Sequence, residues 1–473
     1  MKLKKIVSML LVIAMAFAAF ACAAPAAAPA AEAAPAAEAA PAAEAAAPGE
    51  VEEVYFFSSI GAYQKLLEEE VAKWNEGEGA AKGVRIVMET NIDNYGTALE
   101  TMIAAGTYPD IADMYDKPDM LTAGNARDLY ITPGVEEEVE RFTPYLSQGP
   151  NLRGDKLYAL PLEIVPIKMV YNAEIFAECG LTEAPKTWDE MADMAKTITE
   201  KGAGKYYGFG WTTMWTAMFR RCMMEATISS VGHSYYDNTK ATFDFTPWEP
   251  SVKAIARMYQ EGSMFPTPMD QHIDPIRNRF AEGLVGMEIA PAYDVSVYCN
   301  QFPCDFDWKV ADVPALTDAG LQFKGSSLNR ANVSITTWVS DDRLPAVVTA
   351  WKFLHSRELY KKLYSNSAII PHEPDIIEEV KAEGFENELK NWAEMSDTTN
   401  YTFEPFRVDA LLTLEGDNFH TVFTNIMLGE TTWEAELEGL NARYNAALAQ
   451  AKADGLIDPA IYEQPYSSGP RAN

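Results

Sequence analysis

Residues 54–75 read VYFFSSIGAYQKLLEEEVAKWN, and this stretch decides the fold class. It opens on residues 54–57, a run of β-branched and aromatic side chains that predicts a short strand. A polar turn containing Gly61 follows, and a helix is then expected over residues 64–75. The apolar side chains of that helix recur on one face: Leu66, Leu67, Val71 and Trp74. A strand followed by an amphipathic helix indicates the first half of a β-α-β unit.

The same alternation continues along the chain. We expect a strand at residues 84–88, a helix at 95–105 that ends at Gly106, and a strand at 110–115. Such alternation predicts an α/β fold with a largely parallel sheet. Ligands collect at the carboxyl ends of parallel strands, which here means residues 58–63 and 115–117.

Further elements extend the pattern to the end of the chain. Thr187 and Glu190 form a capping box that starts a helix running to about residue 200. A second helix is expected at residues 346–355, and the C-terminal part is largely helical. Strands are expected at residues 157–161, 167–171, 207–211, 285–290, 309–314 and 333–339.

The first 50 residues predict export. Three lysines precede an apolar run at residues 6–20, which as a helix spans only ~22 Å, less than the ~30 Å of a bilayer core. Residues 1–21 are therefore expected to be a signal peptide. Residues 22–50 repeat Ala, Pro and Glu, and proline interrupts long helices, so this tract is expected to be a solvated stalk. No other apolar run is long enough to span a membrane.

Cys22 stands between the two segments, and the arrangement resembles a bacterial lipoprotein leader. In that family the cysteine is acylated and becomes the new N-terminus, so the resemblance implies lipid attachment at Cys22. The leucine usual three residues before the cysteine is Ala19 here. The alternative is ordinary cleavage after Ala21 with Cys22 incidental. Both alternatives export the protein.

The net charge of the chain argues against some classes of partner, and its length indicates the number of lobes. The chain carries a net charge of −31, and without the signal peptide 35 basic residues face 69 acidic ones, a net charge of −34. Such a surface repels phosphate backbones and anionic lipid, which argues against nucleic acid and peripheral membrane binding. The roughly 420 residues after the stalk suffice for two globular lobes.

Four cysteines remain beyond Cys22: Cys179, Cys222, Cys299 and Cys304. If any of them form a disulfide, the short spacing favours Cys299 with Cys304. Four free thiols are equally compatible with the sequence.

Six short segments, spread between about residues 54 and 450, together carry a family resemblance. They are AGTYPDI at 105–111, GDKLYALP at 154–161 with Tyr171 and Asn172 beyond it, PKTWDE at 185–190, FAEGLVGM at 280–287, AWKFL at 350–354 and GETT at 429–432. Together they resemble the extracellular solute-binding proteins of ABC importers, in the sugar-binding branch that includes maltodextrin-binding protein. The resemblance implies a periplasmic-binding-protein-like fold, with two α/β lobes around a ligand cleft.

The resemblance also implies a hinge of three chain crossovers, expected near residues 164–167, 310–314 and 366–371. We therefore expect residues 51–164 and 314–368 to form lobe 1, residues 165–313 and 369–460 to form lobe 2, and residues 461–473 to be a tail. The chain departs from the family where a Gly-rich turn usually precedes the strand at 333–339: it has Ser326, Ser327, Arg330 and Asn332. This departure leaves the identity of the sugar open.

A sugar pocket needs aromatic faces for the pyranose ring and planar polar groups for its hydroxyls. Loop positions after strands supply such residues, and Tyr293 follows Pro291 where the family places a stacking aromatic. The spacing of the two tryptophans fits one face of a core helix equally well, and the two aspartates also suit solvated loops or caps. The candidates are Ser59, Tyr63, Tyr115, Asp116, Glu163, Trp211, Trp215, Tyr293, Asp294 and Asn332.

Enzyme signatures for serine hydrolases, phosphate-binding loops and zinc peptidases do not occur in the sequence, so we expect no catalytic residue. The histidines are scattered, and no metal or cofactor is expected. The resemblance implies a monomeric, lipid-anchored receptor that delivers a neutral mono- or oligosaccharide to the permease subunits of an ABC transporter. Alternatives are a same-fold receptor for a polyamine or other small cation and, less favoured, a secreted glycoside hydrolase, whose two carboxylates would have to face one bond.

Overall fold

The computed structural model describes residues 51–92, 94–114, 124–146, 151–325, 327–385, 392 and 408–463. The signal peptide, Cys22 and the stalk lie outside these residues, as do Tyr115 and Asp116. Among the described helices, none combines the length and the apolar character needed to cross a membrane. None of the four described cysteines takes part in a disulfide bond.

The N-terminal elements follow the predicted alternation. Strand β1 (Glu52–Ser58) leads into α1 (Gln64–Glu76), β2 (Val84–Thr90), α3 (Tyr95–Ala105) and β3 (Ile111–Asp113). β1 pairs in parallel with both β2 and β3. Helix α3 ends because Gly106 adopts a left-handed conformation, φ 73°, which a residue without a Cβ tolerates. Local periodicity therefore predicted these elements correctly.

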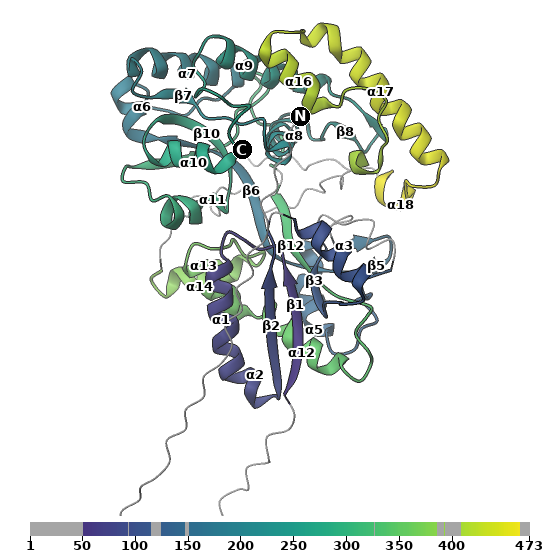
Figure 1. Cartoon of the computed structure of the whole chain (residues 1–473). Helices are drawn as coiled ribbons and strands as arrows, with labels where there is room; N and C mark the ends of the chain where they lie inside the picture. Colours follow the sequence, from purple (N-terminus) through teal and green to yellow (C-terminus); the bar gives the residue numbers. More distant parts are fainter. Residues whose placement is uncertain are drawn as a thin grey trace, which may run out of the picture. The chain divides into compact units, whose positions relative to one another are not determined.

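The sheet as a whole is mixed, which corrects the expectation of a largely parallel sheet. Its eight strands run in the order β2-β1-β3-β12-β6-β10-β7, with β11 paired to β6 (Figure 1). Strand β12 (Ser327–Ile335) is antiparallel to both of its neighbours, β3 and β6. It joins the sheet after a long excursion of the chain, so no short crossover helix fixes its direction.

Strand β6 (Leu160–Asn172) joins the two parts of the sheet. Its first half pairs with β12 as far as Pro166, and from Ile167 onward it pairs with β10 (Val285–Pro291). The second half also pairs with β11 (Trp308–Ala311). The exchange of partners falls inside the segment 164–167, where the first crossover is expected. Two strands were predicted here, and the structure contains one continuous strand of 13 residues.

Two large hydrophobic cores lie on either side of this exchange. One is built on β1, β2, β3 and α12 (Leu344–Leu354), with Trp351 fully buried. The other packs α7 (Trp188–Gly202), α8 (Thr216–Val231) and α9 (Glu249–Gln260) around Trp188 and Trp248. Helix α7 begins where predicted, because the Thr187 side chain accepts a hydrogen bond from the Glu190 amide. We call these the β1 lobe and the α7 lobe.

The second and third crossovers between the lobes lie later in the sequence than expected. Residues after Val313 stay on the α7 lobe, where the Leu316 amide donates to Ser230 Oγ (3.0 Å) and the Phe323 amide to the Ser229 carbonyl (2.9 Å). The chain thus reaches the β1 lobe only at β12, later than the expected 310–314.

Helix α14 (Pro374–Ala382) likewise remains on the β1 lobe, although residues from 369 onward were expected in the other lobe. Arg357 on α13 (Arg357–Ser365) forms ion pairs with Asp375 (2.9 Å) and Glu379 (2.8 Å) of α14. These pairs hold the two helices together, so the expected boundary at 366–371 is too early.

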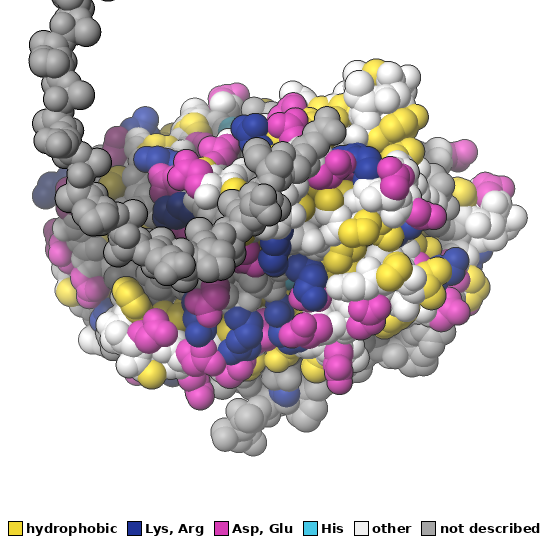
Figure 2. Space-filling view, turned by 90° about the horizontal axis from the view of Figure 1, so that it is seen from below, with side chains coloured by type: hydrophobic (Ala, Val, Ile, Leu, Met, Phe, Trp, Pro, Cys, Tyr) yellow, Lys and Arg dark blue, Asp and Glu magenta, His cyan; other side chains and the backbone are white. Residues whose placement is uncertain are grey.

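Figure 2 shows one face of the molecule, on which acidic side chains are interspersed with Lys and Arg rather than segregated.

The remaining elements complete the two lobes. The elements are α2 (Glu78–Ala81), α5 (Glu136–Phe142), β4 (Leu152–Arg153), β5 (Lys156–Leu157), α6 (Ala173–Cys179), β7 (Tyr207–Phe209), β8 (Tyr236–Asp237), β9 (Thr242–Phe243), α10 (Ile273–Ala281), α11 (Asp294–Ser296), α16 (Phe419–Leu428), α17 (Trp433–Ala453) and α18 (Pro459–Tyr462), with short 3-10 or π segments at Thr143–Tyr145, Thr246–Trp248, Val297–Gln301 and Val408–Leu411.

Candidate functional site

A buried polar cluster lies where β6 passes between the lobes. Glu163 on β6 and Arg330 on β12 are direct cross-strand partners, so the pairing register places their side chains together. Arg330 Nη1 donates to Glu163 Oε1 at 3.2 Å, and the Tyr63 hydroxyl lies 3.5 Å from the same oxygen. Tyr63 reaches this point because it stands at the start of α1, directly after the β1 loop.

The loop after β10 brings a second group to the same place. The Arg330 guanidinium carbon lies 4.5 Å from the centroid of the Tyr293 ring, and that of Arg277 lies 5.9 Å from it. Arg277, on α10, binds Asp294 with two nitrogens, at 3.0 Å and 2.5 Å, and lies 5.5 Å from the Trp215 ring centroid. Seven side chains from both lobes therefore form one continuous site.

The carboxyl groups of Glu163 and Asp294 in this site have raised pKa values. Burial raises the pKa of Glu163 to about 7, although the neighbouring Arg330 charge acts to lower it. Burial likewise raises the pKa of Asp294 to about 6 against the lowering effect of Arg277. Both shifts follow from removing a carboxylate from water, and the arginines only partly offset this cost.

Replacing Glu163 by glutamine is expected to change how stability depends on pH. The folded-state pKa of Glu163 is raised, so its stabilising contribution is complete below pH ~4.5 and is lost as pH rises through about 7. From pH 5 to pH 8 the free energy of unfolding of wild type should therefore fall by roughly 2–3 kcal/mol relative to that of Glu163→Gln. Urea unfolding at both pH values measures this difference. An exposed control, Glu183→Gln, should show none, and a constant difference for Glu163→Gln would contradict the shifted pKa.

Backbone and hydroxyl contacts tie the two lobes together beside this site. Ser296 Oγ, in α11, donates to the Ala62 carbonyl in the β1 loop at 3.2 Å. Ala62 also packs against a hydrophobic cluster that contains Ile164 and Val165 of β6 together with Tyr293. Loops of both lobes thus meet around the middle of β6.

Residues 58–355 match the family model for bacterial extracellular solute-binding proteins. The chain belongs to this family. The matched segment runs from the end of β1 through the β6 crossing to α12, and it contains every described residue of the polar cluster. Solute-binding proteins of this family are not enzymes, in agreement with the prediction of a receptor rather than an enzyme.

Relatives and solved structures agree with this assignment. The solute-binding protein is 25% identical over 241 residues to a binding protein of Brucella abortus, covering 48% of this chain and 57% of that one. It is 25% identical over 183 residues to the sn-glycerol-3-phosphate-binding periplasmic protein UgpB of Escherichia coli K12, covering 36% and 41%. The chain thus spans about half the length of the curated relatives it matches, between 41% and 57%.

Two solved structures share its fold. The sugar-binding protein MalE of Xanthomonas citri superposes with a TM-score of 0.65 at 15% identity, covering 86% of this chain and all of that one. The binding protein RafE in complex with raffinose superposes with a TM-score of 0.61 at 18% identity, covering 85% and 100%. The solute-binding protein therefore has the α/β periplasmic-binding-protein fold that the sequence predicted.

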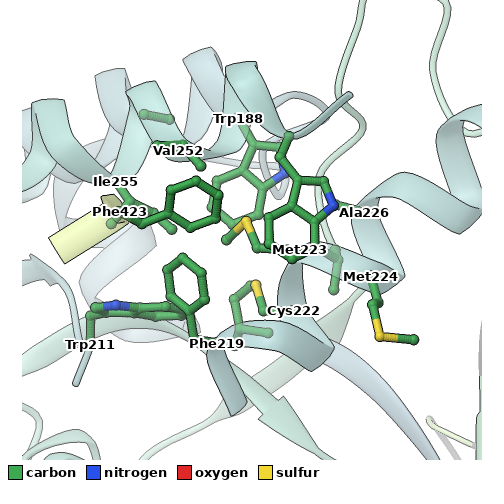
Figure 3. Close-up of a cluster of buried hydrophobic side chains, with 14 of the residues drawn as sticks. Trp188, Trp211, Phe219, Cys222, Met223, Met224, Ala226, Val252, Ile255 and Phe423 are labelled. Atoms are coloured by element: carbon green, nitrogen blue, oxygen red, sulfur yellow. The ribbon is translucent and has the colours of Figure 1, made fainter. Parts of the chain in front are cut away.

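Trp211 lies away from the polar cluster, which corrects its place among the candidates. It is 4% exposed, stacks on Phe209 at 5.6 Å between ring centroids and meets Phe219 edge to face at 5.7 Å. Figure 3 shows it beside Phe219 inside the core of the α7 lobe. The loop after β7 turns inward here, and Trp211 serves packing. Trp215, four residues on, is half-buried and faces Arg277.

Ser59 and Asn332 have local partners of their own in the β1 lobe. The Ser59 hydroxyl donates to Asp113 Oδ2 at the end of β3. Asn332 is fully buried, and its Oδ1 accepts from Asn151 Nδ2 at 2.6 Å. Asn332 therefore supports the interior beneath the site rather than facing a ligand. The structure brings together Tyr63, Glu163, Trp215, Tyr293 and Asp294 of the ten candidates.

Sequence reasoning missed two residues of the cluster. Arg277 lies on an amphipathic helix among other charged residues, and nothing in its local pattern marks it. Arg330 did stand out as a departure from the family's Gly-rich turn, yet it was not counted as a site residue. Alternation along β12 would have pointed both Arg330 and Asn332 to one face of the sheet.

Proposed function

We propose that this solute-binding protein is the substrate-capturing component of an ABC importer and that its solute is a sugar. The observation that carries the proposal is the meeting of Tyr63, Glu163 and Arg330 with Tyr293 and Asp294 where β6 passes between the lobes. Aromatic faces beside planar charged groups are what a pyranose requires. The shared fold with MalE and with raffinose-bound RafE supports a sugar as the ligand.

Capture would proceed by closure of the lobes. β6 and β12 run through the boundary, and bending of these strands would let the lobes rotate. A sugar contacting both lobes favours the closed arrangement, so binding shifts the population toward it. Contacts such as that of Ser296 with Ala62 would form in the closed state. The closed protein would then engage the permease subunits, with the protein acting as a monomer.

Two measurements test this proposal. A thermal-shift screen over mono- and oligosaccharides should show at least one sugar that raises Tm in a concentration-dependent way. Solution scattering with that sugar should show a smaller radius of gyration than without it. Stabilisation by polyamines and by none of the sugars would contradict the sugar assignment, and an unchanged scattering curve at saturation would contradict closure.

We propose further that Cys22 carries the membrane anchor. The support is the sequence around it, which ends an export signal and begins a Pro-rich stalk. Mass spectrometry of the membrane fraction should find a mature chain that starts with a diacylated Cys22. A soluble product with an unmodified Cys22 would contradict the anchor and would leave the binding function intact.

The cation-receptor alternative is weakened by the arrangement of the carboxyl groups. Glu163 and Asp294 are candidate acids for holding an amine, but each already forms an ion pair with an arginine of the protein. A second candidate ligand comes from the relative in Escherichia coli, which is named for sn-glycerol-3-phosphate. That solute is a small anion, and arginines suit it better than a polyamine.

A further inference from the structure

We propose that the solute is an acidic sugar, one that carries a carboxylate or phosphate group, and that Arg330 binds this group. The inference rests on the proposed function, because it names the class of sugar that the same site takes. It departs from the neutral sugar that aromatic and carboxylate residues alone suggested.

The positive charges of three arginines from three different elements act on Tyr293. Arg330 comes from β12 and Arg277 from α10, at the distances given above, and Arg221 comes from α8. Burial raises the pKa of the Tyr293 phenol, and the positive charges of Arg221, Arg330 and Arg277 act in the opposite direction. Arg221 and Arg277 are each 8% exposed, and the Arg330 side chain is 22% exposed. A chain with a large negative net charge thus places three arginines, each at least partly buried, near this ring.

The acidic side chains near these arginines neutralise their positive charges to different extents. Asp294 engages Arg277 through both of its oxygens, and Asp274 adds a contact to Arg277 Nη1 at 2.8 Å. Arg277 is therefore held by the protein itself. Arg330 meets Glu163 through one nitrogen and one oxygen, and that oxygen also lies near the Tyr63 hydroxyl. Asp113 adds a weaker favourable charge at Arg330.

Glu163 is a weak counter-ion for Arg330. Its raised pKa means that near neutral pH a substantial fraction carries no charge, whereas a guanidinium stays charged throughout. Burying a cation without a full counter-charge is costly, and an anionic ligand would remove that cost. A neutral pyranose could not, because its hydroxyls carry no net charge.

The geometry suits such a ligand. Tyr293 lies against Arg330 at 4.5 Å, a cation–π contact that fixes the position of the guanidinium. A guanidinium has five N–H donors in a rigid fork, and the contact with Glu163 involves one nitrogen. The fork can therefore still engage a carboxylate or phosphate in a two-point contact. Arg330 is also the most exposed of the three arginines, so it is the one that a solute can reach.

Calorimetry on the mature chain with matched sugars tests the proposal. The probes are glucose with glucuronate and glucose 6-phosphate, galactose with galacturonate, and maltose and raffinose as neutral oligosaccharides. At least one acidic sugar should bind tenfold or more tightly than its neutral partner, and raising the salt concentration should weaken it. The carboxylate and phosphate arms distinguish the two sources of charge.

Variants of Arg330 assign the effect to this side chain. Arg330→Gln should lose tenfold or more of the affinity for the acidic sugar, and Arg330→Lys should retain part of it because the charge remains. Arg279→Gln, on an exposed side chain of the same α10 helix as Arg277, should change nothing. Melting curves of each variant verify that it is folded.

The outcomes separate the two proposals. If a neutral sugar binds as tightly as its acidic partner, or if a folded Arg330→Gln variant keeps its preference for the acid, the acidic-sugar inference is overturned and the sugar receptor stands. If neither acidic nor neutral sugars bind, both proposals fail.

Discussion

Replacing Trp211 by alanine is expected to lower the free energy of unfolding by about 3–5 kcal/mol, the cost typical of emptying a large aromatic site in a core. The ring is stacked on Phe209 and enclosed by Phe219 and its neighbours, so the cavity cannot collapse easily. Urea unfolding followed by circular dichroism measures the loss. Solute affinity, measured well below Tm, should stay within a factor of three.

Trp215→Ala is the matched comparison, because Trp215 is half-buried and faces Arg277 at the polar cluster. It should cost much less stability than Trp211→Ala and should weaken solute binding instead. If Trp211→Ala is instead as stable as wild type and binds the solute poorly, Trp211 belongs to the binding site and its assignment to the core is wrong.

Replacing Arg277 by methionine should destabilise the protein by about 3–5 kcal/mol, because it leaves Asp294 buried without its partner. The penalty should be smaller at pH 5 than at pH 8. Without Arg277, Asp294 avoids an uncompensated charge by taking up a proton, and lower pH supplies that proton. Denaturant unfolding at the two pH values measures both effects.

The double variant Arg277→Met/Asp294→Leu provides the control. Removing both charges together should recover most of the lost stability, since a buried ion pair contributes little beyond well-packed apolar groups. If the double variant is as unstable as the sum of the single variants, the two side chains do not act as a pair.

The parts of the fold that sequence predicted are those with local causes. Helix α3 and its end at Gly106 follow from apolar spacing and from the conformational freedom of glycine, and the start of α7 follows from Thr187. The direction of β12 and the continuity of β6 through Pro166 depend on pairing between residues far apart in sequence. Local periodicity contains no information on such pairing.

The same distinction explains the candidate site. Tyr63, Glu163 and Tyr293 were found because each follows or lies within a recognisable strand at an expected loop. Trp211 and Trp215 could not be told apart, since the four-residue spacing says nothing about which side chain the loop turns inward. Arg277 escaped notice because its partner Asp294 stands 17 residues away on another element.

The insertion of β12 between β3 and β6 has a consequence for biosynthesis. A nascent chain that has emerged only as far as residue 326 contains β1, β2, β3 and β6 but lacks the strand that joins them. The β1 lobe therefore cannot complete its sheet until more than two thirds of the polypeptide has been made. Contacts of such long sequence separation form slowly. The β1 lobe is therefore expected to fold more slowly than a lobe whose sheet is built from strands consecutive in sequence.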